Sequence, residues 1–252
     1  MKALALSLAI GLLSACGQSG DATVSAPISH PHGPTVAALP FTIEGAMLSD
    51  LFQNHVKVAR IGVGVNGGSA AQWAATSIAI AERVATFGAD SIEVSVRRSD
   101  ITQSQGHRFR EVARAYYSPN PSHSVWEDRG QWQVMQADAA SLSTQQDVNI
   151  DEAFSALNQQ FIDKGMAPDA ADRKAAAVIG KTYHLPKDWR LPVGNRLKDV
   201  SRDAMNVDAA PASVGLAALA GKPTFNDIPR QMTPEGNVLR VAGGQSRVDV
   251  GR

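Results

Sequence analysis

Apolar and polar residues alternate with a period of two in two segments of the N-terminal half, one within residues 56–68 and one at 91–98. This alternation predicts strands with one buried face, because successive side chains point to opposite faces of a sheet. The apolar positions are Ile61, Val63 and Val65 in the first segment and Ile92, Val94 and Val96 in the second. The polar or small positions are Arg60, Gly62 and Gly64, then Glu93, Ser95 and Arg97.

A helical pattern separates these two strands. Ser69 is a suitable N-cap and Gly88 a suitable stop for this helix. A strand, helix, strand unit of this length favours a parallel, right-handed crossover. The shared apolar face consists of Trp73, Ile80, Val84 and Phe87.

Two more strands are expected at residues 111–118 and 131–138. The segment between them contains two prolines and the turn signal Asp128-Arg129-Gly130, which suit a long hairpin connection. The pattern therefore predicts an α/β (α+β) fold with a small mixed sheet of about four strands and flanking helices.

Further helices are expected before and after these strands along the chain. Residues 43–55 place Met47, Leu48, Leu51 and Phe52 at helical spacing. A second helix has Ile150, Phe154, Leu157 and Phe161 on one face, Asn149 and Glu152 as a capping box and Gly165 as a stop. A third opens at Asp169 and Asp172, has Ala171, Ala175, Val178 and Ile179 on one side and frays near Gly180.

From about Asp208 the chain is rich in Gly and Pro with few apolar anchors, which predicts a mobile tail.

The N-terminus has the dimensions of an export signal. After Met1-Lys2, residues 3–13 are almost entirely apolar. Eleven helical residues span about 16 Å, well short of the ~30 Å hydrocarbon thickness of a bilayer. This length predicts a cleavable signal peptide rather than a membrane-spanning helix.

Leu13-Ser14-Ala15-Cys16 resembles the lipobox of bacterial lipoproteins, with Leu three residues before the cysteine and small residues between them. The resemblance implies that the chain is cut before Cys16. It further implies that the sulfur of Cys16 receives a diacylglyceryl group and that the new amine is acylated. Gly17 rather than Asp follows the cysteine, which resembles the signal for release to the outer membrane of a Gram-negative cell. In a Gram-positive cell the anchor would stay in the single membrane.

Charge and cysteine content exclude several classes of protein. The chain of 252 residues has 24 basic and 24 acidic side chains and a net charge of zero, so no overall field attracts it to nucleic acid. Its single cysteine excludes an internal disulfide, a CxxC redox pair and a thiolate zinc site. Membrane attachment must therefore come from the lipid on Cys16, and we expect no other cofactor and no metal site.

Gly62-Val63-Gly64-Val65-Asn66-Gly67 matches the glycine pattern of dinucleotide-binding loops. The alternation of Ile61, Val63 and Val65 continues through the first two glycines, which places them inside the strand rather than in a turn. We therefore favour glycines on one face of a strand, where a helix or a partner backbone comes close.

The histidines offer only a weak case for catalysis. His30 and His32 lie in the expected tether, His55 at an expected helix end, and His184 at the end of another helix, where a positive charge is favoured. His107 and His123 flank a strand and could converge with Glu127 or Asp128. No G-x-S-x-G, S-x-x-K, H-E-x-x-H or P-loop motif accompanies them.

Residues 164–202 are mildly basic, which indicates either a solvated face or a docking patch for an acidic partner or for lipid headgroups. Two short helices in this region could suggest a helix-turn-helix, but an exported protein has no DNA to read. The expected interaction residues are Trp126, Trp189, Arg190 and Arg196.

Together these features predict an envelope lipoprotein that acts as a binding or assembly module, with a secretion or transfer apparatus as one setting, and that faces the periplasm if the cell is Gram-negative. The alternatives are a lipid-anchored hydrolase that uses His107 or His123, and a ligand-binding lipoprotein. The expected organisation is a signal peptide at 1–15, a lipidated N-terminus and tether at 16–40, an α/β domain at 41–140, a helical extension at 141–207 and a flexible tail at 208–252.

Overall fold

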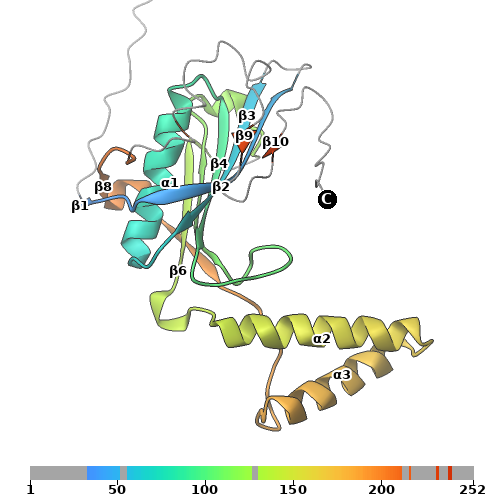
Figure 1. Cartoon of the computed structure of the whole chain (residues 1–252). Helices are drawn as coiled ribbons and strands as arrows, with labels where there is room; N and C mark the ends of the chain where they lie inside the picture. Colours follow the sequence, from blue (N-terminus) through green and yellow to red (C-terminus); the bar gives the residue numbers. More distant parts are fainter. Residues whose placement is uncertain are drawn as a thin grey trace, which may run out of the picture. The chain divides into compact units, whose positions relative to one another are not determined.

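The computed structural model describes residues 33–51, 56–126, 130–211, 216, 231–232 and 238–239 (Figure 1). The helices are α1 (Ala70–Ala85), α2 (Gln145–Asp163) and α3 (Pro168–Thr182). The strands are β1 (Thr35–Val36), β2 (Phe41–Leu51), β3 (Val56–Val65), β4 (Ser91–Arg98), β5 (Glu111–Tyr117), β6 (Trp132–Ala137), β7 (Leu197–Val200), β8 (Asn206–Val207), β9 (Gln231–Met232) and β10 (Val238–Leu239). Short 3-10 turns lie at Pro121–His123, Ala139–Ser141 and Arg202–Ala204.

The main sheet has six strands in the order β2-β3-β4-β5-β6-β7, in which β3 and β4 are parallel and all other neighbours antiparallel. The predicted mixed α/β class is confirmed, as are the strand, helix, strand unit β3-α1-β4 and the hairpin β5-β6. The expected number of about four strands was too low, because β2 and β7 extend the sheet at its two edges.

Strand β2 corrects the helix expected at residues 43–55. It pairs antiparallel with β3, with Leu48 opposite Ala59. Ala46 and Leu48 are buried while Met47 between them is exposed, which is a strand pattern. Met47, Leu48 and Leu51 have helical spacing, but a short apolar run fits a strand equally well. The conformation is set by the pairing of this segment with β3.

Strand β7 has no alternation of apolar and polar residues from which it could be predicted. Its four residues, Leu197–Val200, are half-buried or exposed and do not alternate cleanly. It is held by antiparallel pairing with β6, where Val200 lies opposite Val134. A short edge strand with charged side chains is a common way to end a sheet without inviting aggregation.

Helix α1 covers one face of the sheet (Figure 1). Ser69 is the N-cap of this helix, as expected, and forms a capping box with Gln72; Gly88 follows the end of the helix with a φ of +89°. Trp73 is buried against the sheet and its indole N–H donates to the carbonyl of Gly67 at 2.7 Å. The core between helix and sheet contains Ile61, Val63, Val65, Ile80, Val84, Ile92, Val94 and Val96.

Helices α2 and α3 form a hairpin with its own small core of Ile150, Phe154, Ala175 and Ile179. The N-cap of α2 is Thr144, in a capping box with Asp147, so the helix starts before the expected Asn149 and Glu152 box. Helix α3 starts at Pro168 and continues through Gly180 to Thr182. Val178 is 38% exposed, whereas it was expected on the packed side. Gly165 ends α2 with a φ of +84°, as expected.

The fold begins before the expected boundary at Phe41 and uses part of the expected tail. Residues 33–40 were assigned to the tether, but β1 pairs parallel with β8, and the amide of Leu39 donates to the hydroxyl of Thr76 at 2.9 Å. In the segment from 208, Leu216 is only 3% exposed in the core, and β9 pairs antiparallel with β10. The signal peptide, Cys16 and most of the tail lie outside the described residues.

Candidate functional site

The sheet face opposite α1 is charged, and no described helix packs on it. The polar positions of β3 and β4 lie side by side there, since Arg60 is opposite Glu93 and Gly62 opposite Ser95 in the parallel register. Strand β5 adds Arg114 opposite Ser95. The charged face, as we call it, consists of Glu44, Arg60, Glu93, Ser95, Arg97, Arg110, Glu111 and Arg114.

Each carboxylate of the charged face has two partners. Glu44 accepts from Arg110 and lies 3.5 Å from the guanidinium of Arg97. Glu93 lies 3.4 Å from Arg60 and 3.7 Å from Arg114. Glu111 accepts from Arg114 at 2.6 Å and from the hydroxyl of Ser95 at 2.8 Å.

These contacts and partial burial shift two guanidinium pKa values in opposite directions. Burial lowers the pKa of Arg97, against the attraction of Glu44 and Glu111. Burial acts the same way at Arg114, but there the hydrogen bonds and charge of Glu111 prevail and raise the pKa. The interactions with Glu111 therefore outweigh the cost of burying the charge of Arg114. At Arg97, the nearby carboxylates do not fully offset that cost.

An open cleft of about 370 Å³ lies on the charged face. Strand β2 forms one side with Gly45, Ala46 and Met47, and His107 contributes from the loop between β4 and β5. The floor is formed by β3 and β4, through Arg60, Ile61, Gly62, Glu93, Ser95 and Arg97.

The first two glycines of the glycine-rich stretch leave space for side chains of the charged face. Gly62 and Gly64 lie inside β3, as the alternation predicted. A Cβ on Gly62 would be 2.9 Å from the guanidinium of Arg97, and one on Gly64 would be 2.6 Å from a carboxylate oxygen of Glu44. The expectation of a helix or partner backbone close to these glycines was therefore wrong: side chains of the chain itself occupy the space.

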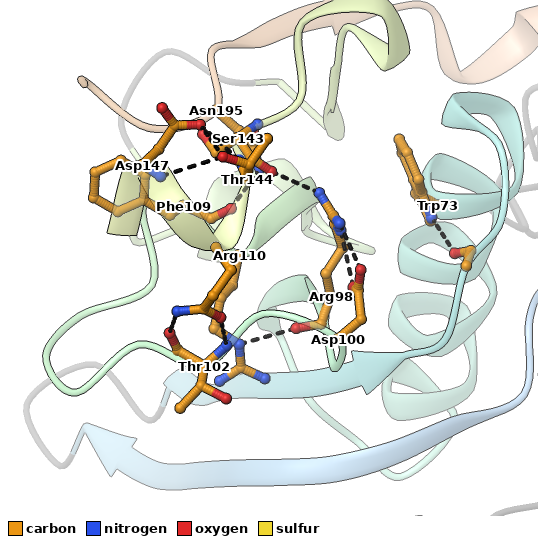
Figure 2. Close-up of polar contacts among 12 residues, drawn as sticks. Trp73, Arg98, Asp100, Thr102, Phe109, Arg110, Ser143, Thr144, Asp147 and Asn195 are labelled. Atoms are coloured by element: carbon orange, nitrogen blue, oxygen red, sulfur yellow. Dashed lines mark hydrogen bonds and ion pairs between the residues drawn. The ribbon is translucent and has the colours of Figure 1, made fainter. Parts of the chain in front are cut away.

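The loop between β4 and β5 is fastened at both ends (Figure 2). The backbone amide of Arg98 donates to the carbonyl of Arg110 at 2.8 Å. In return, the side-chain Nε of Arg110 donates to the carbonyl of Arg98 at 2.9 Å. Arg98 also holds Asp100 with two hydrogen bonds of 2.9 and 2.5 Å, which lower the pKa of that carboxyl, and donates to the carbonyl of Ser143. The side chain of Gln145, in the first turn of α2, donates to and accepts from the backbone of Thr102.

Asn195 joins this loop to the segment that follows α3. Its amide nitrogen donates to the carbonyls of Phe109 and Glu111, at 2.9 and 3.0 Å. Its amide oxygen accepts from the backbone of Ser143 at 2.8 Å (Figure 2). Nothing in the sequence marks this asparagine, because its partners are backbone groups more than fifty residues away.

The structure does not bring His107 and His123 together. His107 lines the cleft near Arg97, at the end of β4, whereas His123 lies 3.6 Å from Asp90, just before its start. The seven residue steps of β4 correspond to roughly 23 Å. Burial, then the charge of Arg97, lowers the pKa of His107. His184 has a φ of +53° after the end of α3, and His30, His32 and His55 lie outside the described residues.

The two tryptophans among the four expected interaction residues, Trp126 and Trp189, pack on different elements. Trp126 packs on Tyr116 with ring centroids 5.1 Å apart, and Arg60 lies over its indole at 5.1 Å, so it borders the charged face. Trp189 instead folds onto α3, where a Cβ on Gly180 would be 2.8 Å from its indole nitrogen. Arg190 and Arg196 are exposed in the segment between α3 and β7.

With the described residues, the basic segment 164–202 forms ion pairs near its C-terminal end. Lys198 lies 3.5 Å from Asp138, and Arg202 lies 2.7 Å from Glu82. Over the described ranges, the other cations of the segment form no ion pair, consistent with a solvated face.

The described residues contain neither a candidate metal site nor a candidate membrane-spanning helix. No cluster of three or more His, Cys, Asp or Glu side chains in these ranges could hold a metal ion. Within the same ranges, every helix is too short or too polar to cross a bilayer.

Comparisons with known proteins give little guidance. No family model matches the chain, and no curated protein matches it. A solved structure of a DUF487 family protein from Desulfovibrio piger is similar, with 15% sequence identity and a TM-score of 0.49, over 67% of this chain and 98% of that chain. This similarity is too weak to assign a family or a function.

Proposed function

We propose that this protein is a lipid-anchored binding module of the bacterial cell envelope that docks a protein partner on the charged face of its sheet. The observation that carries the proposal is the asymmetry of the sheet. Helix α1 buries one face, while the other has an open cleft framed by interlocked charged side chains.

Binding fits this face better than catalysis. Among the described residues, the carboxylates that line the cleft or border it each have two cationic or hydrogen-bonding partners, which favour the charged form and do not favour a role as general base. The hydroxyl of Ser95 donates to Glu111 rather than to a histidine. His107 and His123 lie at opposite ends of β4, so a hydrolase that used His107 or His123 would have that one histidine at its site without the other.

The anchor would be the lipid on Cys16. The apolar run at residues 3–13 and the Leu13-Ser14-Ala15-Cys16 sequence support it. Each buried methylene contributes about 0.8 kcal/mol, so two or three acyl chains hold a protein stably where one holds it reversibly. The setting would be the outer membrane of a Gram-negative cell, facing the periplasm, within a secretion or transfer assembly.

The anchor is tested by replacing Cys16 with Ser and following the full chain in membrane and soluble fractions. The variant should leave the detergent phase, and mass spectrometry of the native chain should find acyl chains at residue 16. Unchanged partitioning of Cys16→Ser, or an unmodified Cys16, would overturn the anchor.

The docking face is tested by placing a photo-crosslinking amino acid in cells at Met47 or, as a control, at Val178. Both side chains are 38% exposed, but Met47 lines the cleft and Val178 lies on α3. A defined partner should be captured from position 47 and not from 178. Capture from 178 alone would contradict the proposed face.

A further inference from the structure

Guanidinium groups outnumber carboxylates on the charged face. In its described part, four arginines, Arg60, Arg97, Arg110 and Arg114, share three carboxylates, Glu44, Glu93 and Glu111. The charged residues that line the cleft itself are Arg60, Arg97 and Glu93, which together carry one net positive charge. The cleft is therefore complementary to a ligand group with a single negative charge.

The two arginines that line the cleft are the least completely paired. The side chain of Arg60 is 50% exposed, and its Nε lies 3.4 Å from a carboxylate oxygen of Glu93. Arg97 donates through its Nε to Ser95 at 3.1 Å, and its Nη1 lies a long 3.5 Å from Glu44. Both therefore keep donors for a ligand, and a guanidinium can hold a carboxylate through two parallel hydrogen bonds.

Both guanidiniums are also held in position. Arg60 lies over the indole of Trp126, with its Cζ 5.1 Å from the ring centroid. Arg97 lies across Gly62, where any side chain would displace it. Pre-positioned donors lose less conformational entropy on binding, which favours affinity.

The shape of the cleft favours a peptide over a small anion. One side is β2, with the exposed thioether of Met47 next to the backbone of Gly45 and Ala46. Met47 lies opposite Arg60 in the register of β2 and β3, so an apolar contact and a cation lie side by side. A peptide can use both at once, through an acidic residue and an apolar neighbour.

We propose that the cleft binds a carboxylate of an acidic segment of a protein partner, between Arg60 and Arg97. This inference rests on the proposed docking function and names the chemistry of the partner. The segment supplies a glutamate or aspartate side chain to the two guanidiniums and an adjoining side chain to Met47.

The test measures binding of a fluorescently labelled, end-blocked hexaglutamate peptide to the full chain in detergent, at about 0.15 M salt. Arg60→Gln and Arg97→Gln should each weaken binding about tenfold or more, the loss expected for a charge-assisted hydrogen-bonded pair. Arg83→Gln is the matched control, because Arg83 also lies over an aromatic ring, Phe87, but on α1. It should leave the affinity unchanged within about twofold.

Three results would overturn the inference. These are equal binding of a hexaglutamine peptide, an equal loss in Arg83→Gln, and displacement of the peptide by inorganic phosphate at equal concentration. If Arg97→Gln fails to fold, Gly62→Ala serves instead, since it displaces the guanidinium without removing its charge. If a partner is crosslinked from position 47 but hexaglutamate does not bind, the proposal of a carboxylate ligand is rejected and the docking function is kept. If neither crosslinking nor hexaglutamate binding is observed, the docking function itself is rejected.

Discussion

The guanidinium of Arg97 lies directly across Gly62, with its Cζ and both Nη atoms 2.9 Å from the place where a Cβ would stand. The two residues are on neighbouring parallel strands, β3 and β4, and both belong to the cleft. A missing side chain on one strand therefore sets the position of a charged side chain on the next.

Gly62→Ala tests this relationship. The added methyl group should displace the flexible end of Arg97 and lower hexaglutamate affinity about tenfold. The free energy of unfolding should change by less than about 1 kcal/mol, because the guanidinium can move and alanine suits a strand at least as well as glycine. Peptide titration and urea unfolding measure the two quantities.

The double variant Gly62→Ala with Arg97→Gln provides the control. If Gly62 acts through Arg97, the double variant binds no more weakly than Arg97→Gln alone. Additive losses would mean that Gly62 affects the cleft by another route.

His107 should couple ligand binding to pH. Burial, and then the charges of Arg97 and Arg110, lower the pKa of His107 below its ordinary value of 6.5, while the Gly106 backbone and Glu111 act in the opposite direction. Because the folded pKa is depressed for a base, its contribution to stability is complete above about pH 6.5 and is lost as the pH falls through the folded pKa.

A carboxylate bound beside His107 favours the imidazolium, so hexaglutamate should raise the pKa of His107. Affinity should then increase as the pH falls from about 7.5 to about 5.5, where glutamates remain ionised. NMR titration of the His107 ring with and without peptide measures the shift. His107→Gln should flatten the pH dependence of binding; a slope that persists in this variant would assign it to another group.

Asn195→Ala should destabilise the attachment of the hairpin to the sheet. The change removes three hydrogen bonds and leaves the carbonyls of Phe109 and Glu111 and the amide of Ser143 without this partner. We expect a loss of about 2 to 4 kcal/mol in the free energy of unfolding and faster hydrogen exchange at Ser143. Thermal unfolding and amide exchange are the measurements.

Asn206→Ala is the comparison for Asn195→Ala, since Asn206 is exposed and its side chain makes one 3.4 Å contact with Thr35. It should change stability by no more than about 0.5 kcal/mol. An equal change in the free energy of unfolding for the two substitutions would show that Asn195 has no special role in attaching the hairpin.

Adjacent residues of α3 should differ sharply in their contribution to stability. Ile179 is 2% exposed in the core of the hairpin, and Val178 is 38% exposed. Ile179→Ala should cost about 2 to 4 kcal/mol by leaving a cavity, and Val178→Ala about 0.5 kcal/mol or less. Denaturant unfolding of both variants measures the two losses in the free energy of unfolding. A larger loss for Val178→Ala would mean that the buried face of α3 is the one that carries Val178.

Part of the charged face was visible in the sequence. The alternation in residues 56–68 and 91–98 placed Arg60 and Gly62, then Glu93, Ser95 and Arg97, on polar faces. Trp126, expected at an interface, does border this face. Glu44 was hidden because β2 was taken for a helix, and Asn195 because its partners are backbone atoms.

The sequence by itself determined the mixed α/β class, the β3-α1-β4 unit and the faces of its two strands, because periodicity and capping act between residues close along the chain. The Cys16 anchor, also based on local sequence, stays a prediction. Only the tertiary structure decided the edge strands, the separation of His107 from His123 and the pairing of Arg97 with Gly62. These depend on strand order and register, which are set by hydrogen bonds and packing between segments distant in sequence.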